Sequence, residues 1–150
     1  KSKTIFTIMT LDELKQKVYK DLPVDKEHLD TESLRNQELY AKYLDYKTNF
    51  EFLLAKAKGE YTTMFRNKWE YYGGKSDAKV YASKPFDLKV LKSDLNIYIE
   101  SDQEIIDAKN KIVYLETTVK FLEGVQRSIQ SRGWDIKNAI EWRKFEAGMV

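Results

Sequence analysis

The sequence lacks cysteine altogether and has one histidine and two prolines among 150 residues. Without cysteine the chain forms no disulfide and carries no thiolate, which fits a reducing cytoplasm. The single histidine, His28, leaves the chain without a Ser–His or Cys–His pair, a two-histidine metal helix or a zinc site of its own. His28 lies in a polar segment, where we expect it to be solvated. We therefore predict that the protein is not an enzyme, and we predict neither a metal nor a cofactor.

Long apolar runs are missing too. No stretch approaches 18 consecutive apolar residues, so the sequence predicts no membrane span. The first ten residues lack the apolar run and small-residue cleavage site of a signal peptide, and we expect none. An excess of one charge is also missing, since 26 Lys and Arg face 24 Asp and Glu. If the protein binds a polyanion, it does so through local charge or through many weak sites added together.

Two further kinds of site have little support. The segment Gly73-Gly74-Lys75 lacks the spacing of a phosphate-binding P-loop, and we interpret it as a helix end. Carboxylates are plentiful, but they are mixed with lysines on helix faces, as in solvated surface. A small nuclease that uses clustered carboxylates and magnesium is therefore the least favoured function.

What is abundant predicts long helices. The sequence Thr-Leu-Asp-Glu at residues 10–13 is a capping box, which opens a short helix that continues to about Lys20 and ends at Leu22-Pro23. Asp30 or Thr31 is predicted to cap a second helix over residues 33–72, where no proline interrupts an apolar period of three to four residues. Gly73-Gly74 is predicted to end that helix.

The middle of the chain alternates apolar and polar residues instead. The alternation covers residues 86–90 and 95–100, which are joined by a turn at 91–94. This pattern predicts a β-hairpin. A lone hairpin is only marginally stable, so we expect it to pack on a helix or to pair with a neighbouring subunit.

A second capping box, Ser-Asp-Gln-Glu at residues 101–104, begins the next predicted helix, which Gly133 is predicted to end. A last helix is predicted from Trp134 to Ala147. The first of these two helices has apolar residues in alternating steps of three and four, as in a coiled-coil seam: Ile105, Ala108, Ile112, Leu115, Val119, Leu122, Gln126 and Ile129. The seam fits packing against the 33–72 helix and also fits contact between subunits, with the width of the stripe modestly favouring an oligomer.

Residues 65–75 mix cations with aromatic rings at the end of the second predicted helix. Arginine and lysine neutralise phosphates and exposed rings stack on bases, which together hold single-stranded nucleic acid. Trp69 and Tyr72 are three residues apart and continue the apolar stripe, so a place in the core explains them equally well.

From about Met9 to Gly148 the chain resembles the UvsY family, the recombination mediators of T-even phages. The first match is the Leu11-x-Asp/Glu-Leu start of the first helix. The second is the motif Arg66-x-Lys68-x-Glu70-Tyr71-Tyr72-x-Gly74. The clearest match is C-terminal and comprises Ser131-Arg132-Gly133, Ile136-Lys137, Arg143 and Phe145-Glu146-Ala147-Gly148. The segment between the glycines and the C-terminal helix matches loosely, and residues 1–8 lie outside the resemblance.

The resemblance implies a homo-oligomeric ring, expected to have six to eight subunits, that binds single-stranded DNA and has no catalytic activity. It implies loading of a RecA-like recombinase onto strands covered by single-strand-binding protein, in the cytoplasm of the infected bacterial host. It assigns DNA binding to Arg66 and Lys68. Trp69 replaces a leucine of the family. It either stacks on bases or fills a hydrophobic slot, and we favour the slot.

Lys75 is the fourth predicted DNA-binding residue, with Arg66, Lys68 and Trp69. Lys79, Arg132 and Lys137 are further candidates, although the last two also fit helix packing or subunit contacts. We expect a mainly α fold with long helices and a small β-hairpin insertion, in which residues 1–78 carry the DNA-binding segment and residues 79–150 the hairpin and the oligomerising helices. The alternative is a non-catalytic coiled-coil adaptor without a nucleic-acid role.

Overall fold

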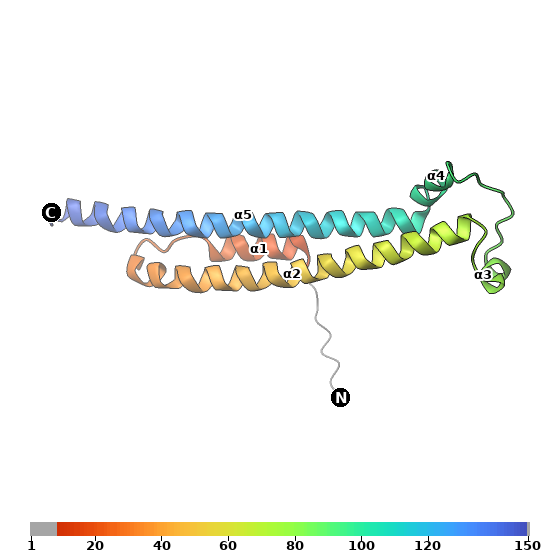
Figure 1. Ribbon diagram of the computed structural model, residues 1–150. Helices are drawn as coiled ribbons and strands as arrows, with labels where there is room; N and C mark the ends of the chain where they lie inside the picture. The colour runs from red at the N-terminus through yellow and green to blue at the C-terminus, as the bar shows by residue number, and fades with distance from the viewer. Residues whose placement is uncertain (1–8, 150) are drawn as a thin grey trace, which may run out of the picture. The chain divides into compact units, whose positions relative to one another are not determined.

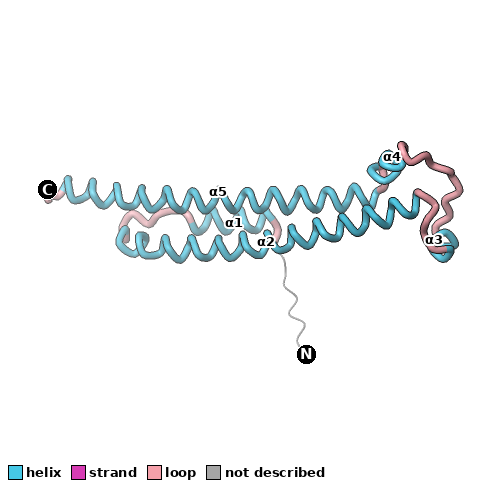
Figure 2. Tube along the Cα trace, viewed as in Figure 1, coloured by secondary structure: helices cyan, strands magenta, loops and turns pink. Residues whose placement is uncertain are grey.

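The computed structural model describes residues 9–149, so the prediction about a signal peptide lies largely outside the described residues (Figure 1). Figure 2 shows helices joined by loops, and no strand occurs in the described range. The helices are α1 (Leu11–Asp21), α2 (Leu29–Tyr72), α3 (Ala78–Ser83), α4 (Leu95–Glu100) and α5 (Gln103–Glu146). The predicted mainly α fold is confirmed. Within residues 9–149, none of these helices is long and apolar enough to cross a membrane.

The start of the chain follows the predicted capping chemistry. The Glu13 amide donates to the Thr10 hydroxyl at 3.2 Å, and the Thr10 amide donates to the Glu13 carboxylate at 3.4 Å. The capping box at α1 is therefore confirmed. The next helix begins earlier than expected, at Leu29, so Asp30 and Thr31 lie in its first turn instead of capping it. His28, just before α2, is exposed and pairs with Asp25 at 2.9 Å.

The described residues form two compact units, and each takes one part of α2 and one part of α5. Unit 1 contains the described residues up to Thr48 together with residues 118–149, and unit 2 contains Asn49–Thr117. The boundaries of these units differ from the predicted division at residue 78, because segments far apart in the sequence pack together within each unit.

The predicted seam of α5 is used inside each unit. In unit 1, Leu122 and Ile129 of α5 are buried. Leu14 of α1 and Leu39 and Tyr43 of α2 are buried in the same unit. In unit 2, Ile105 and Leu115 are buried in the same way. Intramolecular packing therefore accounts for most of the seam, and an oligomer has to use other residues.

Gly133 does not end the C-terminal helix, because α5 continues without interruption to Glu146. The predicted separate helix from Trp134 is therefore wrong. A Cβ atom at Gly133 would lie 3.0 Å from Nδ2 of Asn36, which donates to the Ile129 carbonyl at 2.9 Å. The absence of a side chain at Gly133 therefore allows α2 to approach α5 closely. The real end of α5 is followed by Gly148, whose φ of 72° is left-handed.

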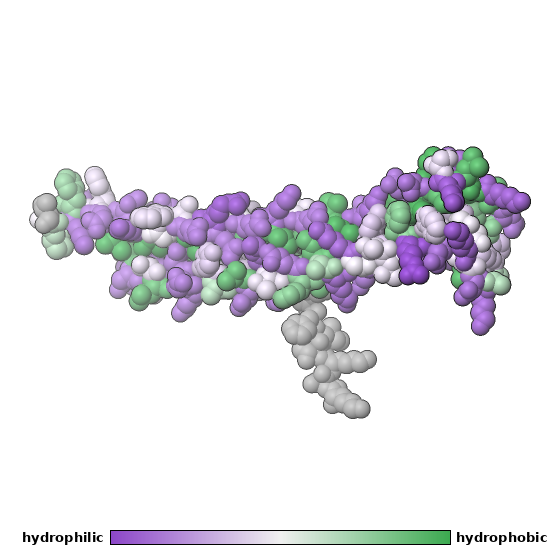
Figure 3. All heavy atoms as spheres, in the orientation of Figure 1, coloured by the Kyte–Doolittle hydropathy of each residue, from purple (hydrophilic) through white to green (hydrophobic). Residues whose placement is uncertain are grey.

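The predicted β-hairpin is wrong. Residues 86–91 are irregular, and Leu95–Glu100 form α4. Leu95 and Ile99 are four residues apart, so a helix places them on one face as readily as a strand places alternate residues on one face. They are buried with Ile105, and Tyr61, Met64, Phe65, Tyr72 and Val90 pack against this cluster. Figure 3 shows hydrophobic residues gathered at α4.

The second capping box is also only partly formed. Asp102 caps α5, because its carboxylate accepts from the Glu104 amide at 2.9 Å. The Ser101 hydroxyl instead donates back to the Ile97 carbonyl of α4 at 2.7 Å. The cap is therefore one residue later than the sequence pattern predicted.

Candidate nucleic-acid interface

The candidate interface lies in unit 2, where α2 ends. The Lys75 amide donates to the Glu70 carbonyl at 2.8 Å and the Gly74 amide to the Tyr71 carbonyl at 3.3 Å, the hydrogen bonds of a Schellman motif. Gly74 has the left-handed φ of 76° that this motif needs. A Cβ atom at Gly73 would lie 2.8 Å from the Trp69 carbonyl oxygen, so this position also requires glycine. The predicted helix end at the glycine pair is confirmed.

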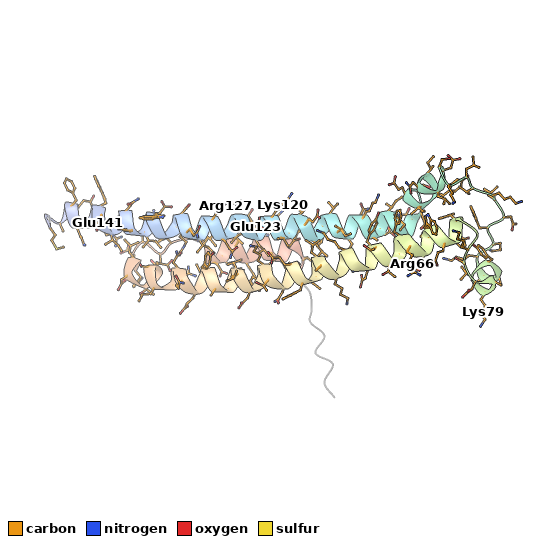
Figure 4. All side chains as sticks on the ribbon, viewed as in Figure 1. Arg66, Lys79, Lys120, Glu123, Arg127 and Glu141 are labelled. Atoms are coloured by element: carbon orange, nitrogen blue, oxygen red, sulfur yellow. The ribbon has the colours of Figure 1, made fainter. Side chains whose placement is uncertain are left out.

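Arg66 projects from the last turns of α2 with 79% of its side chain exposed (Figure 4). Its Nε atom lies 3.2 Å from a carboxylate oxygen of Glu70, one helical turn later. An exposed pair of this kind is weak, typically below about 1 kcal/mol. The guanidinium can therefore exchange Glu70 for a phosphate with little loss.

Trp69 lies three residues after Arg66, on the same side of α2. Its side chain is 37% exposed, and the Lys75 ammonium lies 4.4 Å from the centroid of its ring. The structure therefore does not place Trp69 in the buried slot that we favoured. Arg66, Trp69 and Lys75 together form an exposed set of two cations and one indole, which we call the α2 cation–indole surface.

Lys68 has a different environment. Its side chain is only 15% exposed, and its ammonium lies 3.1 Å from the carboxylate of Asp102 and 3.4 Å from that of Glu104. The Tyr72 hydroxyl donates to the same Asp102 oxygen at 2.6 Å. Lys68 therefore joins the end of α2 to the start of α5 and is not a free surface cation.

The protonation of this network follows from its contacts. Burial acts to raise the pKa of Asp102, but the hydrogen bonds from Tyr72 and Lys68 outweigh it and lower that pKa. Burial, together with the hydrogen bond to Asp102, raises the pKa of Tyr72. Asp102 is thus held as a carboxylate and Tyr72 as a neutral donor, which keeps the charge of Lys68 satisfied inside the protein.

Of the further candidates, Lys79 lies exposed on α3 (Figure 4), and the other two lie in unit 1. Arg132 is 5% exposed and donates from Nε to the Leu22 carbonyl at 2.7 Å. It also contacts Pro23, Asn36 and Glu32. Arg132 is therefore a packing residue that fixes the connection after α1. Lys137 is exposed, with its ammonium 5.4 Å from the centroid of the Trp134 ring.

The sequence did not reveal a cluster of aromatic rings that supports the interface. Tyr71 stacks on Tyr81 with ring centroids 5.5 Å apart, and Tyr72 meets Phe86 edge to face at 5.0 Å. The Tyr81 hydroxyl donates to the Tyr71 carbonyl at 2.8 Å and so satisfies the end of α2. The two tyrosines of the motif therefore anchor the connection to α4. The one available signal was the high aromatic content, 13% of residues.

An open groove of about 1010 Å³ lies beside this surface. Its charged lining is balanced, with four lysines and four carboxylates: Lys56, Lys68, Lys75, Lys84, Glu60, Glu70, Asp77 and Glu104. Lys75 borders both the groove and the α2 cation–indole surface. The groove lining as a whole is balanced and does not attract a phosphate backbone, so the exposed side of α2 with Arg66 and Trp69 is the better candidate. No group of three or more metal-ligating side chains occurs within the described residues.

Three comparisons with known proteins agree with the fold and with the family that the sequence resembles. The chain is 24% identical over 140 residues to the "Recombination protein uvsY" of Enterobacteria phage T4, covering 93% of this chain and 99% of that protein. A crystal structure of the bacteriophage T4 recombination mediator protein UvsY (lattice type II) has a TM-score of 0.82 at 24% identity, over 93% of this chain and 98% of that chain. A second (lattice type I) has a TM-score of 0.80 at 23% identity, over 89% and 98%.

A family model spans almost the whole chain. Its description is "Recombination, repair and ssDNA binding protein UvsY", and it matches residues 17–149. With the family model matching well over half of its residues, the chain belongs to the UvsY family.

Proposed function

We propose that the protein is a recombination mediator, which binds single-stranded DNA and promotes loading of a RecA-like recombinase onto strands covered by single-strand-binding protein. Membership of a family described by recombination, repair and single-stranded-DNA binding supports this function. The observation that carries the DNA-binding part is the α2 cation–indole surface. We place the activity in the cytoplasm of the infected bacterial host, by analogy with the phage relative.

In this proposal Arg66 and Lys75 neutralise phosphates while a base stacks on Trp69. Stacking of one base on an aromatic side chain contributes roughly 1–3 kcal/mol and is tolerant of sequence. Lys68 belongs to the same site as a positioning residue, because its ion pairs with Asp102 and Glu104 hold the end of α2 in place.

We further propose that the protein acts as a homo-oligomeric ring of six to eight subunits. Large apolar side chains stay exposed near the end of α5, where Trp142, Phe145 and Met149 are 60%, 67% and 65% exposed. Trp142 and Phe145 are three residues apart and so lie on one face of α5, and Met149 follows just after the helix ends. An exposed apolar face of this kind marks a protein contact. This agrees with a division of labour in which residues 1–78 contact DNA and residues 79–150 contain the oligomerising part.

A ring explains how a chain with a formal net charge of +2 holds a polyanion. Each subunit contributes few cations, but once one site is occupied the later contacts are intramolecular, which raises the overall affinity by orders of magnitude. We propose that the ring holds the strand, extends or kinks it, and so lowers the free energy of nucleating a recombinase filament.

The test is fluorescence anisotropy of a labelled single-stranded oligonucleotide, titrated with the full chain at low and moderate salt. We expect binding that weakens steeply with salt, because each phosphate contact makes the slope of log K against log salt steeper by about 0.7. The R66A/K75A variant should bind at least about tenfold more weakly. The K89A/K92A variant removes the same charge from the exposed loop before α4 and serves as the matched control.

Two outcomes contradict different parts of the proposal. Absence of binding by the folded wild-type protein at low salt would favour the adaptor function without a nucleic-acid role. Equal affinity of R66A/K75A and wild type would remove the α2 cation–indole surface from the site while leaving DNA binding intact. Loading is tested separately, by the recombinase's DNA-dependent ATPase activity on strands covered by single-strand-binding protein, which the wild-type protein should increase.

A further inference from the structure

Unit 1 presents an exposed face on α5 that the proposed interface does not use. Lys120, Arg127 and Trp134 recur at seven-residue intervals, about 10.5 Å apart along the helix, and Lys137 follows Trp134 by three residues. All four are exposed, and Trp134 is 65% exposed. Seven residues are close to two helical turns, so these side chains lie in line along one side of α5. Figure 4 labels Lys120 and Arg127 along this part of the helix.

The cations of this face are not neutralised by the acids on it. Glu123 lies on the same side of α5, but its carboxylate is 3.8 Å from the Lys47 ammonium of α2. Glu141, further along, lies 3.7 Å from Lys144. Within residues 9–149, Lys120 and Arg127 have no ion-pair partner closer than 4.0 Å. The two carboxylates on this side of α5 are thus paired with other lysines, and Lys120 and Arg127 remain available to an anionic ligand.

Trp134 adds the second element that single-stranded nucleic acid requires. Its ring stays mostly in water, with the Lys137 ammonium 5.4 Å from its centroid. This repeats the arrangement of Lys75 over Trp69 in unit 2, where the distance is 4.4 Å. An exposed indole flanked by free cations combines base stacking with phosphate neutralisation.

We propose that this face of α5 is a second contact for single-stranded nucleic acid. A base stacks on Trp134, and Arg127, Lys137 and Lys120 pair with phosphates along the helix. The proposal rests on the function proposed above and gives each subunit two places, one in each unit, at which it holds a strand. Seven-residue spacing also fits a partner helix, but such contact would bury Lys120 and Arg127 without counter-charges, which is unfavourable.

The first test compares R127A/K137A with wild type in the anisotropy titration. We expect roughly tenfold weaker binding and a slope of log K against log salt that is smaller by about 1.4, the value for two lost phosphate contacts. The K20A/K92A variant removes the same charge from exposed positions elsewhere and should match wild type. If wild type binds DNA and R127A/K137A binds with the same affinity, this proposal is overturned, whereas the proposed role of the α2 cation–indole surface is unaffected.

Sedimentation velocity on R127A/K137A separates DNA contact from assembly. We expect the sedimentation coefficient of wild type. A smaller assembly would overturn the proposal, because the face would then be a contact between subunits. If wild type itself does not bind DNA, the proposed function fails first, and this proposal fails with it.

The second test uses the indole directly. The W69F/W142F variant leaves Trp134 as its single tryptophan. At saturating oligo(dT), its fluorescence should be quenched strongly, because a stacked base removes the excited state of the ring. Binding by anisotropy without quenching of Trp134 would show that no base stacks there and would overturn the proposal.

Discussion

The Lys68 ammonium lies 3.1 Å from the carboxylate of Asp102, although the two residues are separated by the whole connection between α2 and α5. Both side chains are largely buried, with 15% and 11% exposure. Arg66, two residues before Lys68, is by contrast 79% exposed. The two basic positions of one short motif therefore serve two purposes, since Arg66 faces outward and Lys68 supports the fold beneath it.

Replacing Lys68 tests this difference. In K68M the aliphatic stem is kept and Asp102 loses its cation, so we expect the free energy of unfolding to fall by about 1–3 kcal/mol. R66A removes an exposed charge and should stay within about 0.5 kcal/mol of wild type. Urea unfolding followed by circular dichroism measures both. Equal stability of K68M and R66A would show that the buried ion pair contributes nothing.

Arg132 should be the most sensitive cation of unit 1. It is buried and joins the connection after α1 to Glu32 and Asn36 of α2, so R132M leaves the carboxylate of Glu32 with Arg35 alone. We expect a loss of about 3–5 kcal/mol in the free energy of unfolding. R127A is the matched control on the same helix and should be nearly neutral. A mild effect of R132M in urea unfolding would contradict the role assigned to this residue.

Two glycines, Gly74 and Gly59, should respond in opposite ways to replacement by alanine. Gly74 has a φ of 76°, so G74A forces alanine into the left-handed region and should lower stability by about 1–2 kcal/mol. Gly59 lies inside α2 with nothing within 4 Å of an added Cβ atom, so G59A should raise stability by about 0.5–1 kcal/mol. Thermal unfolding of the two variants should therefore shift in opposite directions. An unchanged or raised stability of G74A would contradict the assignment of Gly74 as a left-handed cap, and a lowered stability of G59A would contradict the open space at Gly59.

Stability should fall in acid because of paired carboxylates. The hydrogen bond from Arg35, with further help from Arg132, lowers the pKa of Glu32 below its usual 4.5 in spite of burial. Burial acts to raise the pKa of Asp21, but the hydrogen bonds from Lys42 and Tyr43 outweigh it and lower that pKa below 3.8. A lowered folded-state pKa means stability that is complete above the unfolded-state pKa and is lost as pH falls through the folded-state value.

The measurement is the urea midpoint as a function of pH. From these groups we expect a constant midpoint between about pH 6 and 8 and a decline below about pH 4.5. E32Q should be less stable at neutral pH, because a neutral amide pairs weakly with the two arginines, and its decline in acid should be shallower. An acid decline in E32Q as steep as in wild type would show that Glu32 does not contribute to it.

The long helices could be predicted because their signals are local. The capping box at Thr10, the apolar period of α2 and the glycine pair after Tyr72 each act within a few residues, and the structure keeps all three. Gly133 was misjudged because its reason is not local. It permits the approach of Asn36, which lies on another helix, and no pattern around residue 133 records that contact.

The connection between α2 and α5 shows the second limit. Leu95 and Ile99 fit a strand and a helix equally well over so few residues, and packing against Ile105 decides for the helix. The same holds for the candidate site, where sequence placed Arg66, Lys68 and Trp69 side by side. Which of them is exposed depends on Asp102 and on the aromatic cluster, both distant in sequence.

The apolar end of α5 gives the last prediction. W142A/F145A removes two exposed rings whose centroids lie 5.5 Å apart and which contribute little to either unit's core. We expect sedimentation velocity to show a smaller species with unchanged helical content, while L88A/L91A, which trims two exposed side chains in unit 2, keeps the wild-type assembly. Affinity for a long oligonucleotide should then fall by orders of magnitude, whereas affinity for a short one changes little, because only the long strand reaches several subunits. An intact assembly in W142A/F145A would require that the subunits meet through another surface.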